Sequence, residues 1–347
     1  MQVEGRRTPV PIIDFENPPN FPALVHGSLV EDPLSQAGGA RPRFEPLRTT
    51  LPGLGEAALV RPWHLWEGML LSIRFESRDG SRSDVLGSAV LVAPGVAICA
   101  SHVLKDYWEQ ACRGEVACYC TGISSHGLQT WQLTSWSPVR DTDLTLLGMR
   151  YVAPLPPHRT FKLGFLTTRL PLEHERVVFC GFRPQKVEHI EQGVVVAGNV
   201  IAVPGVITAV YPRGRDRAVL SWPCIEASCP SVIGAMSGGP VFDHFGYLLG
   251  VVCSSFEQGP AYASLLWPAL CQPILSYWPP DLQFNNPTLH SLREHCFILG
   301  REKFSSELQG DGTWAWQLKP WLTFGEPGGA LASPDDDDPA RLLGKCG

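Results

Sequence analysis

Short apolar runs, each bounded by turn residues, are the feature of this chain that most constrains its fold. The 347 residues include 34 glycines and 32 prolines, which interrupt helices and favour turns. From Met69 to Met149 the pattern predicts roughly six strands, spaced as in an antiparallel barrel. These strands are Met69–Phe75, Gly87–Ala93, Val96–Ala100, Val116–Thr121, Trp131–Trp136 and Leu144–Met149.

A second series of strands follows a proline-rich linker at Pro154–Pro157. We expect it to form another barrel of the same kind. After the last strand, Trp267–Trp278 is expected to form a closing helix. The expected strands are Arg176–Phe182, Gly193–Ile201, Val206–Tyr211, Ala218–Trp222, Pro240–Phe242, Tyr247–Cys253 and Ala261–Leu265.

The pattern divides the chain into four parts. Residues 1–60 are rich in proline and glycine and are expected to be an arm that wraps the body. Residues 61–155 and 156–278 hold the two series of strands, and residues 279–347 form a C-terminal extension. Within this extension Leu289–Leu299 is expected to be helical, Gly312–Leu318 a strand, and the acidic run Asp335–Asp338 a solvated tail.

Composition and charge exclude several classes of protein. A net charge of −6 argues against a nucleic-acid-binding surface. The longest apolar stretch, Leu86–Ala100, is broken by glycine and proline, so no membrane span is expected. No signal peptide is expected either, because Asp14, Glu16 and several prolines interrupt the region that follows the N-terminus. The 11 cysteines are an odd number and mostly sit in apolar strand patterns. We interpret them as buried thiols of a cytoplasmic protein.

Three short motifs carry candidate catalytic residues. Ser237 sits among small residues in Gly234–Val241, where a substrate carbonyl could approach backbone N–H groups. A serine nucleophile needs a base, and His102, just after an expected strand, could accept its proton. Asp143 would orient the imidazole, because it directly precedes a Leu-Thr-Leu-Leu strand. Asp141 is the alternative acid, although we expect it to belong to a turn with Arg140.

These motifs resemble those of the chymotrypsin/trypsin-like serine proteases. The matching segments are Ala-Ser-His at 100–102, Asp-Leu-Thr-Leu-Leu at 143–147 and Met-Ser-Gly-Gly-Pro-Val at 236–241. With flanking strands, the resemblance spans about residues 65–277. It implies an all-β fold of two six-stranded antiparallel β-barrels, with a short C-terminal helix and irregular N- and C-terminal extensions. It also implies an active site between the barrels, with His102, Asp143 and Ser237 as the catalytic residues.

The chain departs from the family pattern beside the serine. The resemblance implies an oxyanion hole made by the backbone N–H groups of Ala235 and Ser237, but position 235 is normally glycine. Met236 replaces the aspartate that zymogens pair with a new N-terminus, so activation by N-terminal cleavage is not expected. This resembles intracellular bacterial peptidases of the Deg/HtrA type. Residues 278–347 are few for the PDZ domain that such proteins often carry.

The resemblance also implies substrate contacts. Cys253, Ser254 and Ser255 match the strand that pairs with the substrate backbone. Ser231 matches the base of the primary specificity pocket, and a neutral residue there argues against arginine or lysine as the preferred side chain. No pair of cysteines has zinc-finger spacing, so we expect no metal and no organic cofactor.

The sequence therefore predicts a serine endopeptidase that cleaves protein or peptide substrates through an acyl-enzyme. Two alternatives remain open. The departure at Ala235 and the unassigned flanking segments would suit a pseudoprotease that binds peptides or acts as a scaffold. The other alternative is an effector whose activity a regulatory protein partner gates.

Overall fold

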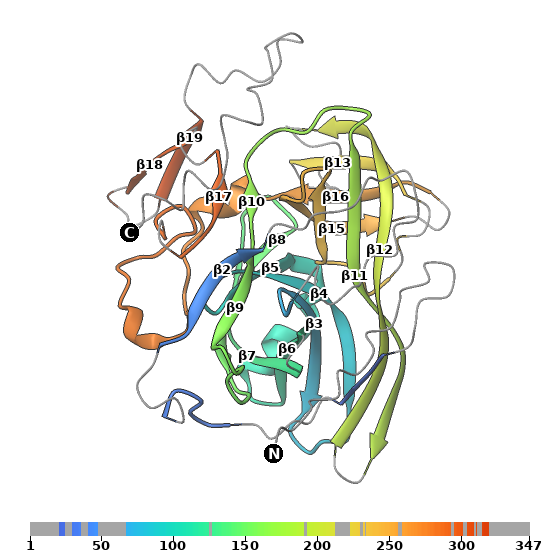
Figure 1. Cartoon of the computed structure of the whole chain (residues 1–347), viewed down its shortest axis with the longest axis vertical. Helices are drawn as coiled ribbons and strands as arrows, with labels where there is room; N and C mark the ends of the chain where they lie inside the picture. Colours follow the sequence, from blue (N-terminus) through green and yellow to red (C-terminus); the bar gives the residue numbers. More distant parts are fainter. Residues whose placement is uncertain are drawn as a thin grey trace, which may run out of the picture.

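The molecule is built almost entirely of strands, with one α-helix among the residues that the structure describes (Figure 1). The structure is a computed structural model. It describes residues 21–24, 30–35, 41–47, 67–124, 127–190, 193–211, 223–229, 232, 234–255, 259–292, 295–300, 304–308, 310 and 314–318.

Six antiparallel strands close the first barrel in the order β3-β4-β5-β8-β7-β6. Each of the six expected strands is present, and most are longer than the sequence predicts. Between β5 and β6 the chain forms the 3-10 turn η2 (Ser101–Val103) and the helix α2 (Lys105–Cys112). The strands are β3 (Leu70–Ser77), β4 (Ser83–Ala93), β5 (Val96–Ala100), β6 (Val116–Ser124), β7 (Gly127–Pro138) and β8 (Leu144–Tyr151).

The second barrel also has six antiparallel strands. Their order is β14-β11-β12-β13-β16-β15, and a further pairing of β14 with β15 closes the ring. The prediction of an all-β fold with two six-stranded antiparallel barrels is therefore confirmed. The strands are β11 (Arg176–Ile190), β12 (Gly193–Tyr211), β13 (Cys224–Ser228), β14 (Pro240–Asp243), β15 (Leu248–Ser255) and β16 (Ala261–Leu265).

Some local expectations were wrong. The closing helix is only the 3-10 turn η3 (Trp267–Cys271), because Pro273 disfavours a helical conformation at the residue before it. The two strands expected over 193–211 form the single strand β12, which continues through Pro204. Within the described chain Pro204 is paired with β11 and not with β13, and a proline is tolerated in a strand where one side is unpaired. The expected strand Ala218–Trp222 lies outside the described residues.

Both extensions contain short strands. In the N-terminal arm, β1 (Phe21–Leu24) pairs with β12, and β2 (Arg43–Leu47) pairs in parallel with β9 (Thr160–Gly164). In the C-terminal extension, β18 (Phe304–Leu308) pairs with β19 (Trp314–Leu318), as the alternation at Gly312–Leu318 predicts.

The remaining extension contacts bring the C-terminal segment to the second barrel. The described residues of 289–299 do not form the expected helix. The segment ends in the strand β17 (Ile298–Leu299), which pairs with β10 (Leu166–Thr167). The strand β10 also pairs with β15. The acidic run Asp335–Asp338 lies outside the described residues.

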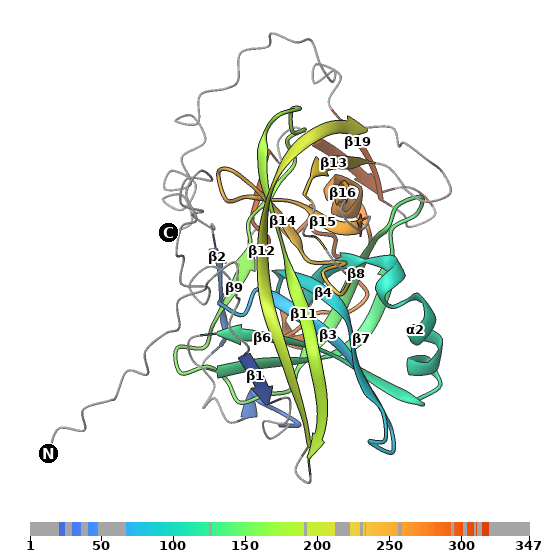
Figure 2. The ribbon, with the colours of Figure 1, turned by 90° about the vertical axis from the view of Figure 1, so that its right-hand side faces the viewer.

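The strand β5 lies between the two hydrophobic cores. Its residues Ala97 and Cys99 are buried in the core of the first barrel, whereas Val96 and Ile98 belong to the core of the second. Because successive side chains of a strand point to opposite faces, one strand can contribute to both cores. The long β11–β12 hairpin runs beside β3 and β4 of the first barrel (Figure 2). The end of β5 therefore carries the chain to the junction of the barrels.

Candidate functional site

The register between two strands brings His102 and Asp143 together. Ala100, the last residue of β5, lies opposite Leu144, the first residue of β8. Just beyond this pair, His102 Nδ1 lies 2.8 Å from Asp143 Oδ2. The backbone N–H of His102 also donates to Asp143 Oδ1, at 3.1 Å. The carboxylate thus fixes both the ring and the backbone of the histidine.

A tight turn before β8 presents the acid. Thr142 Oγ accepts a hydrogen bond from the Leu144 N–H at 3.0 Å and donates to the Val139 carbonyl at 2.8 Å. Asp141 lies in the same turn with a positive φ of 60° and contacts Arg140 at 3.5 Å. Both of these charged side chains are largely exposed, so Asp143 is the carboxylate of this turn that reaches His102.

Ser237 lies on a loop of the second barrel that packs against the end of β5. A Cβ atom added to Gly238 would come within 3.0 Å of the Ala100 nitrogen, so this backbone approach requires glycine. On its other side the loop is held by β15, where the Gly238 N–H donates to the Val252 carbonyl at 2.7 Å. The half-buried Ser237 therefore lies close in space to the segment that carries His102.

Ala235 adopts the left-handed conformation, with φ of +68°. This conformation costs an L-residue roughly 1–2 kcal/mol, whereas glycine adopts it freely. The glycine of this loop stands one position earlier, at Gly234, where φ is not positive. The departure from the family pattern noted in the sequence is thus a residue held in a strained backbone conformation.

Two backbone N–H groups of the loop are available as hydrogen-bond donors. Within the described chain, neither the Ala235 nor the Ser237 N–H donates a hydrogen bond. The carbonyl of Met236 accepts from the Gly239 N–H at 2.9 Å, which fixes the peptide unit that carries the Ser237 N–H. Donors fixed in this way, without a partner of their own, can stabilise a negative oxygen.

Met236 anchors the loop by burial. Its side chain is fully buried, and a Cβ atom on Gly181 of β11 would come within 2.8 Å of the Met236 Cα. Burying a methionine side chain contributes about 1.5–3 kcal/mol. The loop is thus held by apolar contact at the position where a zymogen would use an ion pair.

The serine hydroxyl and the histidine are not hydrogen-bonded to each other. In the described part of the chain, neither Ser237 Oγ nor His102 Nε2 has a hydrogen-bond partner. Nucleophile–base contacts are often long in ligand-free proteins and tighten when substrate binds. The arrangement therefore joins the base to the acid and holds the serine on the adjacent loop.

The hydrogen bond from Asp143 raises the pKa of His102 above its ordinary value of 6.5. Burial acts in the opposite direction, and the charge of Asp143 adds to the increase. The carboxylate therefore stabilises the imidazolium form, which a general base adopts after it accepts a proton.

The expected substrate contacts are described only in part. Ser254 and Ser255 pair with Tyr262 and Ala261 on β16, at the end of β15 that faces the Ser237 loop. Cys253 lies at a bulge between Val252 and Ser254 and is buried. Burial together with the charge of Asp143 raises the pKa of its thiol well above the usual range. Ser231 lies outside the described residues.

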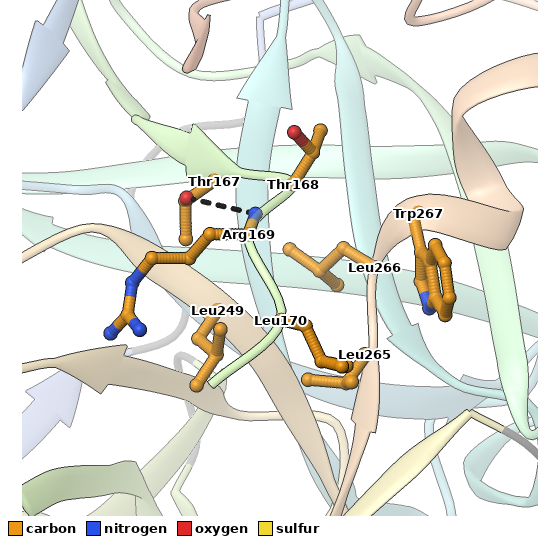
Figure 3. Close-up of a pocket in the computed structure, with 8 residues that line it drawn as sticks. All are labelled: Thr167, Thr168, Arg169, Leu170, Leu249, Leu265, Leu266 and Trp267. Carbon is orange, nitrogen blue, oxygen red and sulfur yellow. Dashed lines mark hydrogen bonds between the residues drawn. The ribbon is translucent and has the colours of Figure 1, made fainter. Parts of the chain in front are cut away.

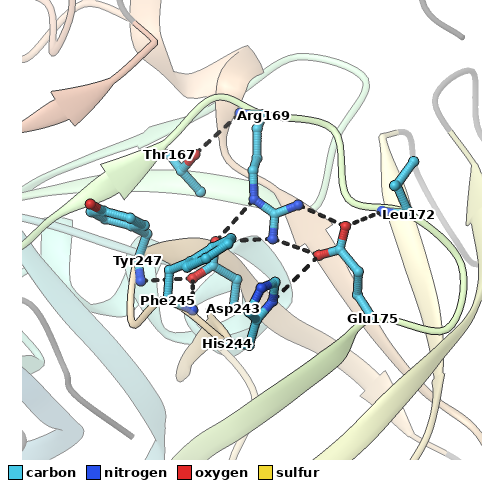
Figure 4. A network of polar contacts seen from close by, with 8 residues as sticks. All are labelled: Thr167, Arg169, Leu172, Glu175, Asp243, His244, Phe245 and Tyr247. Carbon is cyan, nitrogen blue, oxygen red and sulfur yellow. Dashed lines mark hydrogen bonds and ion pairs between the residues drawn. The ribbon is translucent and has the colours of Figure 1, made fainter. Parts of the chain in front are cut away.

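A charged cluster supports the strand that follows the loop (Figure 4). Asp243, the last residue of β14, is fully buried and accepts a hydrogen bond from Arg169 Nε at 3.0 Å. Arg169 also forms a two-pronged contact with Glu175, at 2.8 and 2.6 Å. Burial alone would lower the pKa of Arg169, but these two carboxylates raise it overall. The cluster thus fixes the C-terminal end of β14, whereas the loop with Ser237 leads into its N-terminal end.

The cavities lie away from these residues. The small cavity in Figure 3 is lined by Thr167–Leu170, Leu249 and Leu265–Trp267. A more open groove of about 440 Å³ lies beside α2, with Trp108, Cys112 and Arg78 in its lining. Neither is lined by His102, Asp143 or Ser237.

The described residues offer neither a cluster of metal ligands nor a membrane-spanning helix. They contain no group of three or more His, Cys, Asp or Glu side chains that could hold a metal ion. None of their helices is long and apolar enough to cross a membrane.

Comparison with known proteins gave matches among solved structures. No protein-family model and no curated protein matches the sequence. The structures similar to it include the active form of the Rv3671c protease from M. tuberculosis, with 15% identity, 67% of this chain and 88% of that chain covered, and a TM-score of 0.44. They also include the MamO protease domain from Magnetospirillum magneticum, with 12% identity, 58% and 93% covered, and a TM-score of 0.41.

The HtrA-type protease AlgW, in complex with a decapeptide, is similar as well, with 18% identity, 57% and 61% covered, and a TM-score of 0.39. The chain has a chymotrypsin-like fold. Its two closed six-stranded antiparallel barrels define this fold.

Sequence reasoning missed one residue of this region. Ser88 of β4 is fully buried and contacts the Ser237 loop through both its backbone and its side chain. It stands in the middle of an apolar strand pattern, and no local signal distinguishes it from an ordinary core serine.

Proposed function

We propose that this protein is a serine endopeptidase. Ser237 attacks the substrate carbonyl and forms an acyl-enzyme, His102 accepts its proton as general base, and Asp143 orients the imidazole. The N–H groups of Ala235 and Ser237 stabilise the oxyanion. The substrate is a protein or peptide whose backbone pairs with Cys253–Ser255.

One observation carries this proposal: Asp143 holds both the Nδ1 and the backbone N–H of His102, at 2.8 and 3.1 Å. A carboxylate that contacts Nδ1 leaves Nε2 as the ring nitrogen that can accept a proton. The close approach of Gly238 to Ala100 supports the assignment of Ser237 as the nucleophile of this base.

A second candidate function is a pseudoprotease that binds peptides without cleaving them. The positive φ of Ala235 favours it, because this strain raises the free energy of the conformation that the oxyanion hole would need. A regulatory partner that stabilises this conformation would instead make the protein an effector protease, inactive alone.

Further assignments accompany the main proposal. None of the described cysteines forms a disulfide, which supports a reducing compartment such as the bacterial cytoplasm. We assign residues 61–155 to the domain with His102 and Asp143, and residues 156–278 to the domain with Ser237. Residues 1–60 and 279–347 are assigned as flanking extensions.

A fluorophosphonate probe tests the central proposal, since only an activated serine reacts with it. We expect the full chain to be labelled once, at Ser237, and the Ser237→Ala variant to remain unlabelled. Mass spectrometry of the labelled peptide identifies the site. An unlabelled wild-type chain that still binds peptides would favour the pseudoprotease.

A further inference from the structure

Ser88 connects the first barrel to the candidate oxyanion loop of the second. Its backbone N–H donates to the Ser237 carbonyl at 2.8 Å. Its hydroxyl donates to the Ala235 carbonyl at 3.0 Å and accepts a hydrogen bond from the Phe182 N–H of β11 at 2.9 Å. One buried residue therefore contacts two carbonyls of the loop and a backbone N–H of the neighbouring strand.

The hydroxyl of Ser88 has a defined direction. A serine hydroxyl has a single proton, and because the Phe182 N–H occupies an acceptor position, this proton is available for the Ala235 carbonyl. Ser88 is fully buried, so water does not compete for either bond. The Ser88 hydroxyl therefore donates to the Ala235 carbonyl.

The two carbonyls are held to different degrees. The peptide unit after Ser237 is fixed at both ends, because its carbonyl accepts from Ser88 and the Gly238 N–H donates to Val252. The Ala235 carbonyl, in contrast, has the Ser88 hydroxyl as its hydrogen-bond donor among the described residues. The strained residue of the loop therefore depends on a side chain from the other barrel.

We propose that Ser88 is a positioning residue for the oxyanion hole: its hydroxyl holds the Ala235 carbonyl, and so keeps Ala235 in the left-handed conformation. Among the described residues the N–H of Ala235 has no hydrogen-bond acceptor, so we take its direction to follow from the φ of this residue. Loss of the Ser88 hydroxyl lets Ala235 relax to a negative φ, which rotates this N–H away. The catalytic part of this inference rests on the proposed peptidase function.

The test compares Ser88→Ala, Ala235→Gly and the double variant in the full chain. Glycine adopts a positive φ without help, so it removes the need for the Ser88 hydroxyl. We expect Ser88→Ala to lower kcat/KM for a peptide or ester substrate about tenfold or more, mainly through kcat. The double variant should regain most of this loss. If Ser88→Ala does not fold, Ser88→Cys keeps the volume with a weaker donor and takes its place.

Stability separates positioning from a merely structural role. The double variant still leaves the Phe182 N–H without its acceptor, so chemical denaturation should show it to be less stable than Ala235→Gly alone. Recovery of activity while this loss of stability persists supports the proposal. The control is Ser135→Ala, which removes a buried hydroxyl bonded to Ser276 away from the loop and should leave kcat/KM unchanged.

An NMR measurement tests the conformation of Ala235 independently of catalytic activity. In protein labelled at alanine, NMR couplings report the φ of Ala235, which should change from positive in the wild type to negative in Ser88→Ala. An unlabelled wild-type serine in the probe experiment would refute the peptidase, and the NMR result would still decide the role of Ser88. An unchanged φ in Ser88→Ala, or a loss of activity that Ala235→Gly does not rescue, would overturn the proposal.

Discussion

A side chain on Gly238 would come within 3.0 Å of the backbone nitrogen of Ala100. The loop that carries Ser237 and the strand that ends two residues before His102 are therefore in direct backbone contact across the junction of the barrels. This contact brings together residues that are far apart in the sequence, and it leads to the following predictions.

The first prediction concerns the three proposed catalytic residues. Ser237→Ala, His102→Ala and Asp143→Asn should each lower kcat about 10³–10⁴-fold or more, since each removes a part of one mechanism. Combining them should add little further loss. The control is Asp141→Asn, which changes an exposed carboxylate of the same turn. Full activity of Ser237→Ala against a chromogenic ester would show that another residue is the nucleophile.

The second prediction concerns pH. His102 must be neutral to act as a base, and its hydrogen bond to Asp143 raises its pKa above 6.5. We expect kcat/KM to increase with pH through this raised value, and NMR titration of the His102 ring to give the same midpoint. In Asp143→Asn the midpoint should fall. An imidazole that titrates below 6.5 in the wild type would contradict the role of Asp143.

The raised pKa of His102 also makes the stability of the folded protein depend on pH. Because the folded-state pKa is above the unfolded one, the protonated histidine favours the folded state. This contribution is fully present below about pH 6.5 and is lost as pH rises through the folded pKa. Half of the ring is exposed, so solvent screening keeps the effect small.

The third prediction concerns Ala235→Gly. Glycine removes the cost of the left-handed conformation, about 1–2 kcal/mol. It also destabilises the folded state by about 0.5–1 kcal/mol, because the unfolded chain gains conformational entropy. We expect a net stabilisation of up to about 1 kcal/mol, with kcat/KM raised at most about twofold, because Ser88 already holds Ala235 mainly in the competent conformation. A matched control, Ala111→Gly in α2, should destabilise by about 1 kcal/mol. Lower activity in Ala235→Gly would show that alanine already suits a formed oxyanion hole.

The fourth prediction concerns the charged cluster. Arg169→Met leaves the buried Asp243 and the partly buried Glu175 without this cation, and should lower the free energy of unfolding by about 3–5 kcal/mol. Arg140→Met, which breaks an exposed ion pair, should change it by less than about 0.5 kcal/mol. Urea denaturation measures both. Equal, small effects would mean that the cluster contributes little to the second barrel.

The fifth prediction concerns the thiols. Thiol titration under denaturing conditions, with protein purified from a reducing compartment, should find nearly all 11 cysteines reactive. In the folded protein Cys112 is exposed and should react early, whereas burial raises the pKa of Cys118 to about 11 and slows its reaction. The variant Cys112→Ser should lose one early equivalent. Several stable disulfides would contradict this prediction.

Strand patterns and the family resemblance together predicted the two barrels, and short motifs were sufficient to propose the candidate residues. Strand runs such as Val96–Ala100 were found because a short apolar run between turn residues is a short-range property of the chain. The choice of Asp143 over Asp141 followed from its place directly before the Leu-Thr-Leu-Leu run. In the structure this run begins β8, and the Asp143 side chain contacts His102. The closing helix at Trp267–Trp278 was overestimated, because the composition of a short apolar segment does not fix the kind of helix.

Only the tertiary structure revealed what holds the serine loop. The hydrogen bond from Ser88 to Ala235 joins residues 147 positions apart, and that from Phe182 to Ser88 spans 94. Such bonds depend on how the two barrels pack, and no local pattern encodes that packing. The sequence by itself thus determined the strands, the motifs and the departure at Ala235. The contact between the barrels decided the left-handed conformation of Ala235 and the side chain that holds it.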